Sequence, residues 1–148
     1  MSMDLSFVGR EFPAVEAYLV GVEKVREFAV AIGDSNPLSR DRAAARAAGY
    51  QDLVAPPTFA IAVVARAQDA VLFDPGLGLD FSRVVHGDQR FRYVRPIVAG
   101  DELSCTVVIE SIKTLGSNEI IGLRSDISDA SDGQVVTAFG TLVSRAAP

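Results

Sequence analysis

The stretch PPTFAIAVVARAQDAVLF, residues 56–73, decides the fold that this sequence predicts. From residue 58 its first two turns are apolar on every side, and such a helix must be enclosed by other parts of the protein. Two prolines suit the start of a helix, where the first N–H groups have no partner within the helix. The breakers Asp-Pro-Gly at 74–76 supply the stop. We therefore expect a central helix over residues 58–73, about 22 Å long at the usual rise per residue.

Four segments after this helix have the pattern of β-strands: residues 84–94, 102–115, 120–128 and 134–143. Their connections are short, which predicts that neighbouring strands run antiparallel. In the second segment one face is apolar and should cover the helix, and it carries Leu103, Cys105, Val107 and Ile109. The last segment is apolar on both faces, which suggests that a partner chain covers one of them.

The residues before the central helix predict an extended start that ends near Val20 and then two helices. Apolar residues recur at helical spacing from Val22 to Ile32, with charged residues on the other side. Residues 40–48 are rich in alanine and arginine and predict a short second helix, which Gly49 stops. A chain of 148 residues supports one hydrophobic core. We therefore expect one α+β domain over residues 1–148, a long central helix wrapped by a bent antiparallel sheet.

The composition excludes several classes of function. The net charge is −5 and the arginines are scattered among acidic residues, so the sequence lacks the basic stripe that nucleic acid requires. The first ten residues lack the pattern of a signal peptide, and no apolar stretch reaches the roughly 18 residues of a membrane span, so we expect a cytoplasmic protein. One cysteine and one histidine exclude an internal disulfide and the usual metal clusters, and we expect neither a metal nor a cofactor. Cys105 is predicted to be a small buried residue without a chemical role.

Two motifs carry a resemblance to a known family. The loop GDSNPLS at residues 33–39 and the segment PIVAGDEL at residues 96–103 resemble those of the MaoC-like (R)-specific hydratases and dehydratases. The strings APPTF at 55–59 and VVHGDQ at 84–89 are similar to the N-terminal MaoC-like dehydratase domain, as in the substrate-binding A subunit of the mycolic-acid (3R)-hydroxyacyl-ACP dehydratase and the first repeat of the peroxisomal type 2 enoyl-CoA hydratases.

This resemblance implies the hot dog fold, a role in fatty acid metabolism, and acyl-CoA or acyl carrier protein as the bound partner. It also implies a homodimer, or a heterodimer with a catalytic hot dog subunit. Residue by residue, Asp34 matches the family's catalytic Asp and Asn36 its Asn, but Ser39 stands at the position of the catalytic His. Loss of one member of a general acid–base pair costs ~10²–10⁴ in rate.

The start of the central helix departs from the family as well. Complete members have His-Gly where this chain has Pro56 and Pro57, and proline has no N–H to offer to a thioester oxygen. An oxyanion donor of this kind is worth roughly 3 kcal/mol. The resemblance therefore implies a dehydratase subunit that holds the acyl chain and whose own site is incomplete. The substrate contacts that it implies are Pro57, Thr58, Phe59, His86 and Gln89.

Several alternatives stay open at this point. Asp34 and Asn36 also make good turn and capping residues. His86 is either bonded at a dimer seam or to Asp88, or it faces the acyl channel or takes over the missing proton transfer, and a bulge at Gly87 would re-aim it. Apolar residues of the central helix line a tunnel or form ordinary core: Phe59, Ile61, Val63 and Val64.

Two other classes of protein compete with a dehydratase subunit. One is a non-catalytic homodimeric acyl-thioester binding protein. The other is a hot dog thioesterase, which needs a polar group on the central helix, where Asp69 lies late and is expected to be exposed. Three arginines provide a weak signal for coenzyme A phosphates or an acidic carrier protein: Arg90, Arg92 and Arg95.

Overall fold

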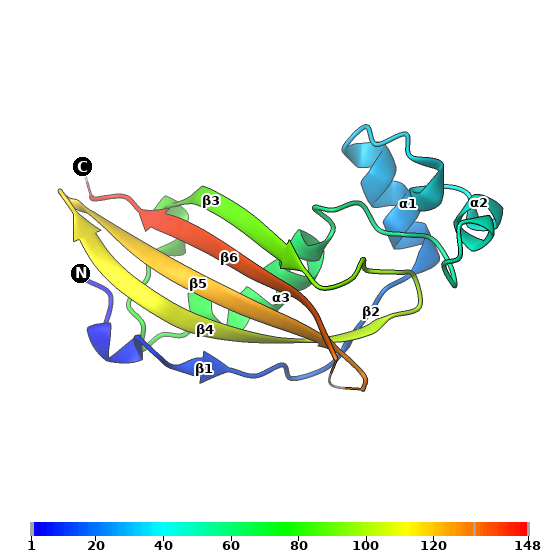
Figure 1. Cartoon of the computed structure of the whole chain (residues 1–148). Coiled ribbons are helices and arrows are strands. Elements are labelled where there is room, and N and C mark those ends of the chain that lie inside the picture. The colour runs from blue at the N-terminus through cyan, green and yellow to red at the C-terminus, as the bar shows by residue number, and fades with distance from the viewer. Residues whose placement is uncertain (1, 132, 148) are drawn as a thin grey trace.

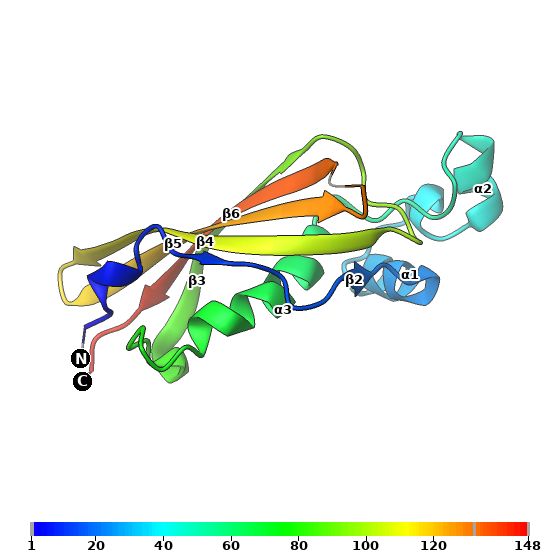
Figure 2. The same cartoon turned by 90° about the horizontal axis from the view of Figure 1, so that it is seen from below.

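A curved antiparallel sheet packs around one helix in the computed structural model, which describes residues 2–131 and 133–147. The helix, α3 (Ala60–Leu72), lies against the inner face of the sheet (Figures 1 and 2). Two shorter helices stand beyond one end of the sheet, α1 (Val22–Ala31) and α2 (Arg42–Ala47). The predicted α+β architecture is confirmed.

The predicted strands match those of the structure to within about two residues at each end. They are β3 (Val84–Tyr93), β4 (Glu102–Leu115), β5 (Asn118–Asp129) and β6 (Gln134–Ser144). Two short strands near the N-terminus, β1 (Glu11–Phe12) and β2 (Tyr18–Leu19), both pair with β4, and the sheet order is β1-β4-β5-β6-β3.

The expected pairing of successive strands holds for β4, β5 and β6 but is wrong for β3. This strand pairs with β6 and forms an edge of the sheet. The chain between β3 and β4 does not turn back along β3, because its backbone is bonded elsewhere. Val98 forms a bridge with Val54, and the Ile97 carbonyl accepts a hydrogen bond of 2.8 Å from the Ala55 N–H.

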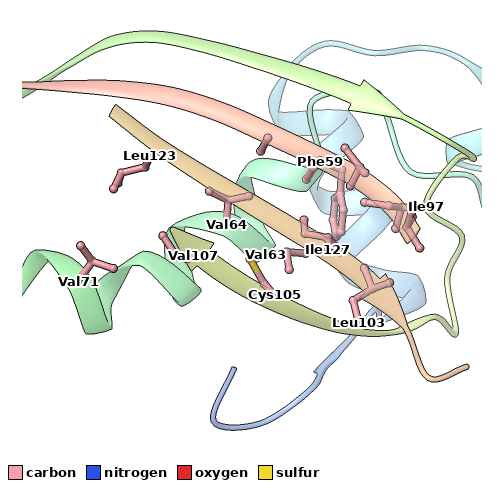
Figure 3. Close-up of a cluster of buried hydrophobic side chains, with 14 of the residues drawn as sticks. Phe59, Val63, Val64, Val71, Ile97, Leu103, Cys105, Val107, Leu123 and Ile127 are labelled. Atoms are coloured by element: carbon pink, nitrogen blue, oxygen red, sulfur yellow. The ribbon is translucent and has the colours of Figure 1, made fainter. Parts of the chain in front are cut away.

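The core fills the space between α3 and the sheet (Figure 3). The predicted apolar face of β4 covers the helix, and Phe59, Val63 and Val64 are fully or almost fully buried against it. The sheet covers one side of α3. The predicted enclosure of its first two turns is incomplete, because Ala65 is exposed, whereas the predicted exposure of Asp69, late in the helix, is confirmed. Arg66 and Ala70 are exposed on the same side.

The helix also starts later than the sequence predicts. Residues 57–59 form a turn in which the Phe59 N–H bonds the Pro56 carbonyl at 2.9 Å, and the regular helix begins at Ala60. The two predicted N-terminal helices are confirmed, and Gly49 ends the second with a φ of 97°, in the left-handed region that glycine tolerates. Among the residues that the structure describes, no helix is both long enough and apolar enough to cross a membrane.

Candidate functional site

The loop between α1 and α2 carries the residues that the sequence singles out first. Gly33 leaves α1 with a φ of 71°, and the Asp34 N–H bonds back to the Ala29 carbonyl at 2.8 Å. The Asp34 carboxylate accepts a hydrogen bond of 2.9 Å from the Asn36 N–H, and the Asn36 side chain accepts one of 3.1 Å from the Leu38 N–H. Both side chains therefore stabilise the local turn, as their residue types favour.

Ser39 joins this loop to the chain that enters α3. Its side chain is only 2% exposed, and its hydroxyl donates a hydrogen bond of 2.6 Å to the Val54 carbonyl. The Val54 N–H in turn bonds the Leu38 carbonyl at 2.9 Å. The hydroxyl proton is therefore committed to the backbone, and Ser39 serves to hold two segments together.

A pocket of about 310 Å³ opens where this loop meets the start of α3. The structure thus brings together the two regions that the resemblance to the MaoC-like proteins assigned to catalysis, the loop and the helix start. The lining residues are Asp34, Asn36, Ser39, Val54, Ala55, Pro56, Pro57, Tyr93, Val94, Arg95 and Pro96.

Tyr93 forms part of the wall of this pocket, and the sequence did not identify it as a site residue. Its hydroxyl donates a hydrogen bond of 2.6 Å to the Pro57 carbonyl. Burial raises the pKa of Tyr93 to about 12, and the nearby Ala60 N–H opposes this rise. The phenol is therefore neutral near pH 7 and covers the start of α3. Strand alternation grouped Tyr93 with Gln89 and Phe91 on one face, but nothing in the sequence indicated that its hydroxyl would reach Pro57.

The positive charge of Arg95, on the same wall, is neutralised by two carboxylates. Its guanidinium contacts Asp101 at 2.8 Å and Asp129 at 3.2 Å. The bond with Asp101 raises the pKa of Arg95. Hydrogen bonds from the Ser131 hydroxyl and from Arg95 lower the pKa of Asp129 to about 2. Arg95 thus fixes the pocket wall by joining two turns, and its charge is already compensated.

His86 and Gln89 lie nearer to the N-terminal end of β3 than Tyr93 does. At Gly87, where a Cβ would stand 2.7 Å from the Thr141 hydroxyl, a bulge shifts the register so that His86 pairs with Leu142 of β6, and His86 is exposed. The His86 Nε2 atom lies 2.9 Å from the Asp88 carbonyl and 3.2 Å from the Gln89 side-chain oxygen. A carbonyl only accepts hydrogen bonds, so Nε2 carries the proton in this arrangement.

The structure does not bring all the predicted site residues together. His86 precedes Tyr93 by seven residues in one strand, a separation of roughly 23 Å, so it cannot reach the pocket of its own chain. Thr58 is exposed beside the pocket, and Phe59 is buried in edge-on contact with the rings of Tyr18 and Phe28. Asp34, Asn36, Ser39 and Pro57 share the pocket, whereas Phe59, His86 and Gln89 lie outside its lining.

Comparison with known proteins gives several matches. A family model described as "FAS1-like, dehydratase domain region" matches residues 6–138. A protein of Streptomyces avermitilis, described as "UPF0336 protein", is 53% identical over 147 residues, which cover 99% of this chain and 98% of the relative.

Two solved structures are also similar. A MaoC-like dehydratase superposes with a TM-score of 0.88 at 32% identity over 96% of this chain, which spans 43% of that protein's length. The C-terminally truncated HadBC (3R-hydroxyacyl-ACP dehydratase) complex from Mycobacterium tuberculosis superposes with a TM-score of 0.85 at 29% identity, covering 97% of this chain and 99% of the matched one.

Proposed function

Because the chain belongs to the family described as "FAS1-like, dehydratase domain region", we propose that it is a subunit of a (3R)-hydroxyacyl-thioester dehydratase, or (R)-specific enoyl hydratase, that holds the acyl chain while its own catalytic site is incomplete. The hot dog fold and the resemblance to MaoC-like dehydratases, both predicted from the sequence, are confirmed by the solved relatives. The substrate in this proposal is an acyl-CoA or an acyl group on a carrier protein.

The chemistry of such a reaction makes three demands on a site. A base takes a proton at C2 of the acyl group, an acid gives a proton to the leaving hydroxyl, and hydrogen-bond donors stabilise the enolate-like oxygen. Each group must lie within hydrogen-bond reach of the atom that it serves. The pocket at Asp34 provides one carboxylate for these tasks, and its other groups decide whether the set is complete.

The bond between Ser39 and Val54 carries the proposal. A serine hydroxyl does not exchange protons near neutral pH as an imidazole does, and this one already donates its proton to a buried carbonyl at 2.6 Å. His86, the single histidine of the chain, is too far along β3 to replace it. Asp34 therefore has no imidazole partner from its own chain.

The start of α3 supports the same conclusion. Pro57 has no N–H, and the Phe59 N–H is used by the Pro56 carbonyl. The Ile61 N–H is likewise used, by the Thr58 carbonyl at 3.1 Å. The usual advantage of a helix N-terminus for an oxyanion is thus reduced in this pocket.

An incomplete site fits a protein that works with a catalytic partner. The similar HadBC structure is described as a complex, and for this chain we propose a heterodimer with a second hot dog subunit whose loop carries both the Asp and the His. The acyl chain would be held by this subunit while the partner performs the proton transfers.

The test compares the chain alone with the chain co-expressed with such a partner. Hydration of crotonyl-CoA and of a longer 2-enoyl-CoA is followed by the loss of enoyl absorbance. We expect turnover only with the partner, and Asp34→Asn should leave the rate of the assembled enzyme within about twofold of the parent. Asp41→Asn, at the exposed N-cap of α2, is the matched control for the substitution itself, because asparagine caps a helix as well as aspartate does.

The opposite results would sink the proposal. Rapid turnover by the chain alone, abolished by Asp34→Asn, means that the site is complete. If the chain binds acyl-CoA but no hot dog partner produces turnover, the result favours the alternative of a non-catalytic acyl-thioester binding protein.

A further inference from the structure

A second cavity, of about 120 Å³, lies between α3 and the part of β4 that carries Leu103 and Cys105. It is covered by residues 13–17, which we call the strap. The strap connects β1 and β2, and Figure 2 shows the chain passing beside α3 between these strands. Phe12 pairs with Val107 and Tyr18 with Leu103, so the five strap residues lie opposite only three residues of β4. The strap must therefore arch away from the edge of β4, and the cavity fills the space beneath it.

The wall of this cavity is made of small and apolar side chains. On α3, Val63, Ala67 and Ala70 follow helical spacing and face it. Alanines of the strap close it from above, and Leu103 and Cys105 form part of its wall on β4. Burial raises the pKa of the Cys105 thiol to about 12, so the thiol is uncharged. A space with a mostly apolar wall suits hydrocarbon, because a polar group buried there without a hydrogen-bond partner is costly.

Charged groups stand only at the rim among the lining residues. Arg66 and Glu16 form an ion pair of 2.8 Å, and their side chains are 62% and 73% exposed, so both charges remain in water. The wall offers no charge with which a charged ligand could pair inside the cavity. Its occupant should therefore be an uncharged apolar group, with any polar part left outside.

The strap is weakly attached. Within the described residues, none of the five strap residues donates or accepts a backbone hydrogen bond with β4. The contact between Glu16 and Arg66 is an exposed ion pair, a type that contributes little to stability. Val15 is 97% exposed and so holds nothing in place. The strap can move aside to admit a ligand at small cost.

We propose that the strap cavity receives the terminal carbons of a long acyl chain, an inference that rests on the proposed function. Phe59 lies between the two sites, because it is two residues after Pro57 of the first pocket and its ring contacts Tyr18 of the cavity wall. Along α3 the rise from Pro57 to Ala67 is roughly 15 Å, so only a long chain spans both sites. Ala67 and Ala70 then set how far the chain enters.

The experiment measures binding of butanoyl-, octanoyl-, dodecanoyl- and hexadecanoyl-CoA to the purified full chain by titration calorimetry. Ala70→Leu and Ala67→Leu fill the cavity from two positions, and Ala47→Leu, an exposed site on α2, is the matched control. Each methylene withdrawn from water improves affinity by about fourfold. We expect the cavity-filling variants to lose about tenfold or more for the two longer chains and less than about twofold for butanoyl-CoA.

Protection of the Cys105 thiol from chemical modification gives an independent test of where the end of the acyl chain lies. A small methanethiosulfonate reagent should modify this thiol slowly, and hexadecanoyl-CoA but not butanoyl-CoA should slow the reaction further. If the wild-type chain binds none of the four acyl-CoA compounds, the proposed function is wrong, and the acyl-binding role of the strap cavity is wrong as well. If long-chain acyl-CoA binds, but neither leucine variant changes its affinity and Cys105 is not protected, the proposed function stands and only the acyl-binding role of the strap cavity is wrong.

Discussion

The Tyr93 hydroxyl and the Pro57 carbonyl are joined by a hydrogen bond of 2.6 Å that ties the end of β3 to the turn before α3. Two parts of the chain that are 36 residues apart are thereby fixed at the mouth of the pocket. The Pro57 carbonyl accepts this bond, which holds the turn before α3 against the end of β3. Its removal should therefore be felt in stability before it is felt in ligand binding.

Tyr93→Phe should lower the free energy of unfolding by about 1 kcal/mol, because it removes one hydrogen bond and leaves the ring in place. Urea denaturation followed by circular dichroism measures the change. Tyr50→Phe is the control, since the Tyr50 hydroxyl has no hydrogen-bond partner in the described part of the chain. Equal effects of the two substitutions would contradict a special role for the bond with Pro57.

Ser39→Ala should cost more, about 1–3 kcal/mol, because it leaves the Val54 carbonyl without its buried donor. The same variant should bind acyl-CoA with an affinity within about twofold of the parent once folded. The measurement pairs urea denaturation with calorimetric titration. A large loss of affinity in a variant of normal stability would show that Ser39 contacts the ligand.

Alkaline stability should depend on Cys105. Burial raises the pKa of this thiol from 9.0 to about 12, so between these values the folded chain keeps a proton that the unfolded chain releases. The thiol's contribution to stability is thus complete below pH 9 and is lost as the pH rises toward 12. The difference in unfolding free energy between the parent and Cys105→Ala should shrink over this range. A difference that stays constant with pH would contradict a buried, neutral thiol.

Acid stability should depend on Asp129. Bonds from Ser131 and Arg95 lower the pKa of Asp129 from 3.8 to about 2, so this carboxylate stabilises the fold above pH 3.8 and loses that effect as the pH falls toward 2. The unfolding free energies of the parent and Asp129→Asn should differ most at pH 5 to 7 and converge as the pH falls from 3.8 toward 2. A difference that stays constant down to pH 2 would contradict an ionised Asp129 that these bonds stabilise.

The sequence was sufficient for most of the secondary structure because local patterns decide it. Residues 102–115 alternate clearly at their start and end at a glycine turn, and β4 has the predicted bounds. Pairing partners are a different matter. Nothing in the alternation of β3 specifies that it joins β6, because that choice depends on where residues 94–101 find their own hydrogen bonds.

The site was predictable in part for the same reason. The motif placed Asp34, Asn36 and Ser39 on one loop, and Pro57 at a helix start, and the structure joins all four at one pocket. Tyr93 was missed because its role depends on the angle between a strand and a helix, which no spacing records. The apolar run after Thr58 overstated the enclosure of α3, since Ala65 and Ala70 are small enough to be tolerated in water.

The two short N-terminal strands have separate anchors on β4, and this gives the edge of the sheet an unusual freedom. A single-residue slip normally turns every side chain of a strand to the wrong face. Here Phe12 and Tyr18 each keep their own register, and the arch between them absorbs any difference in length. Insertions or deletions in that arch can resize the chamber beneath it while the rest of the sheet stays in alignment, so ligand reach can diverge among relatives without a cost to folding.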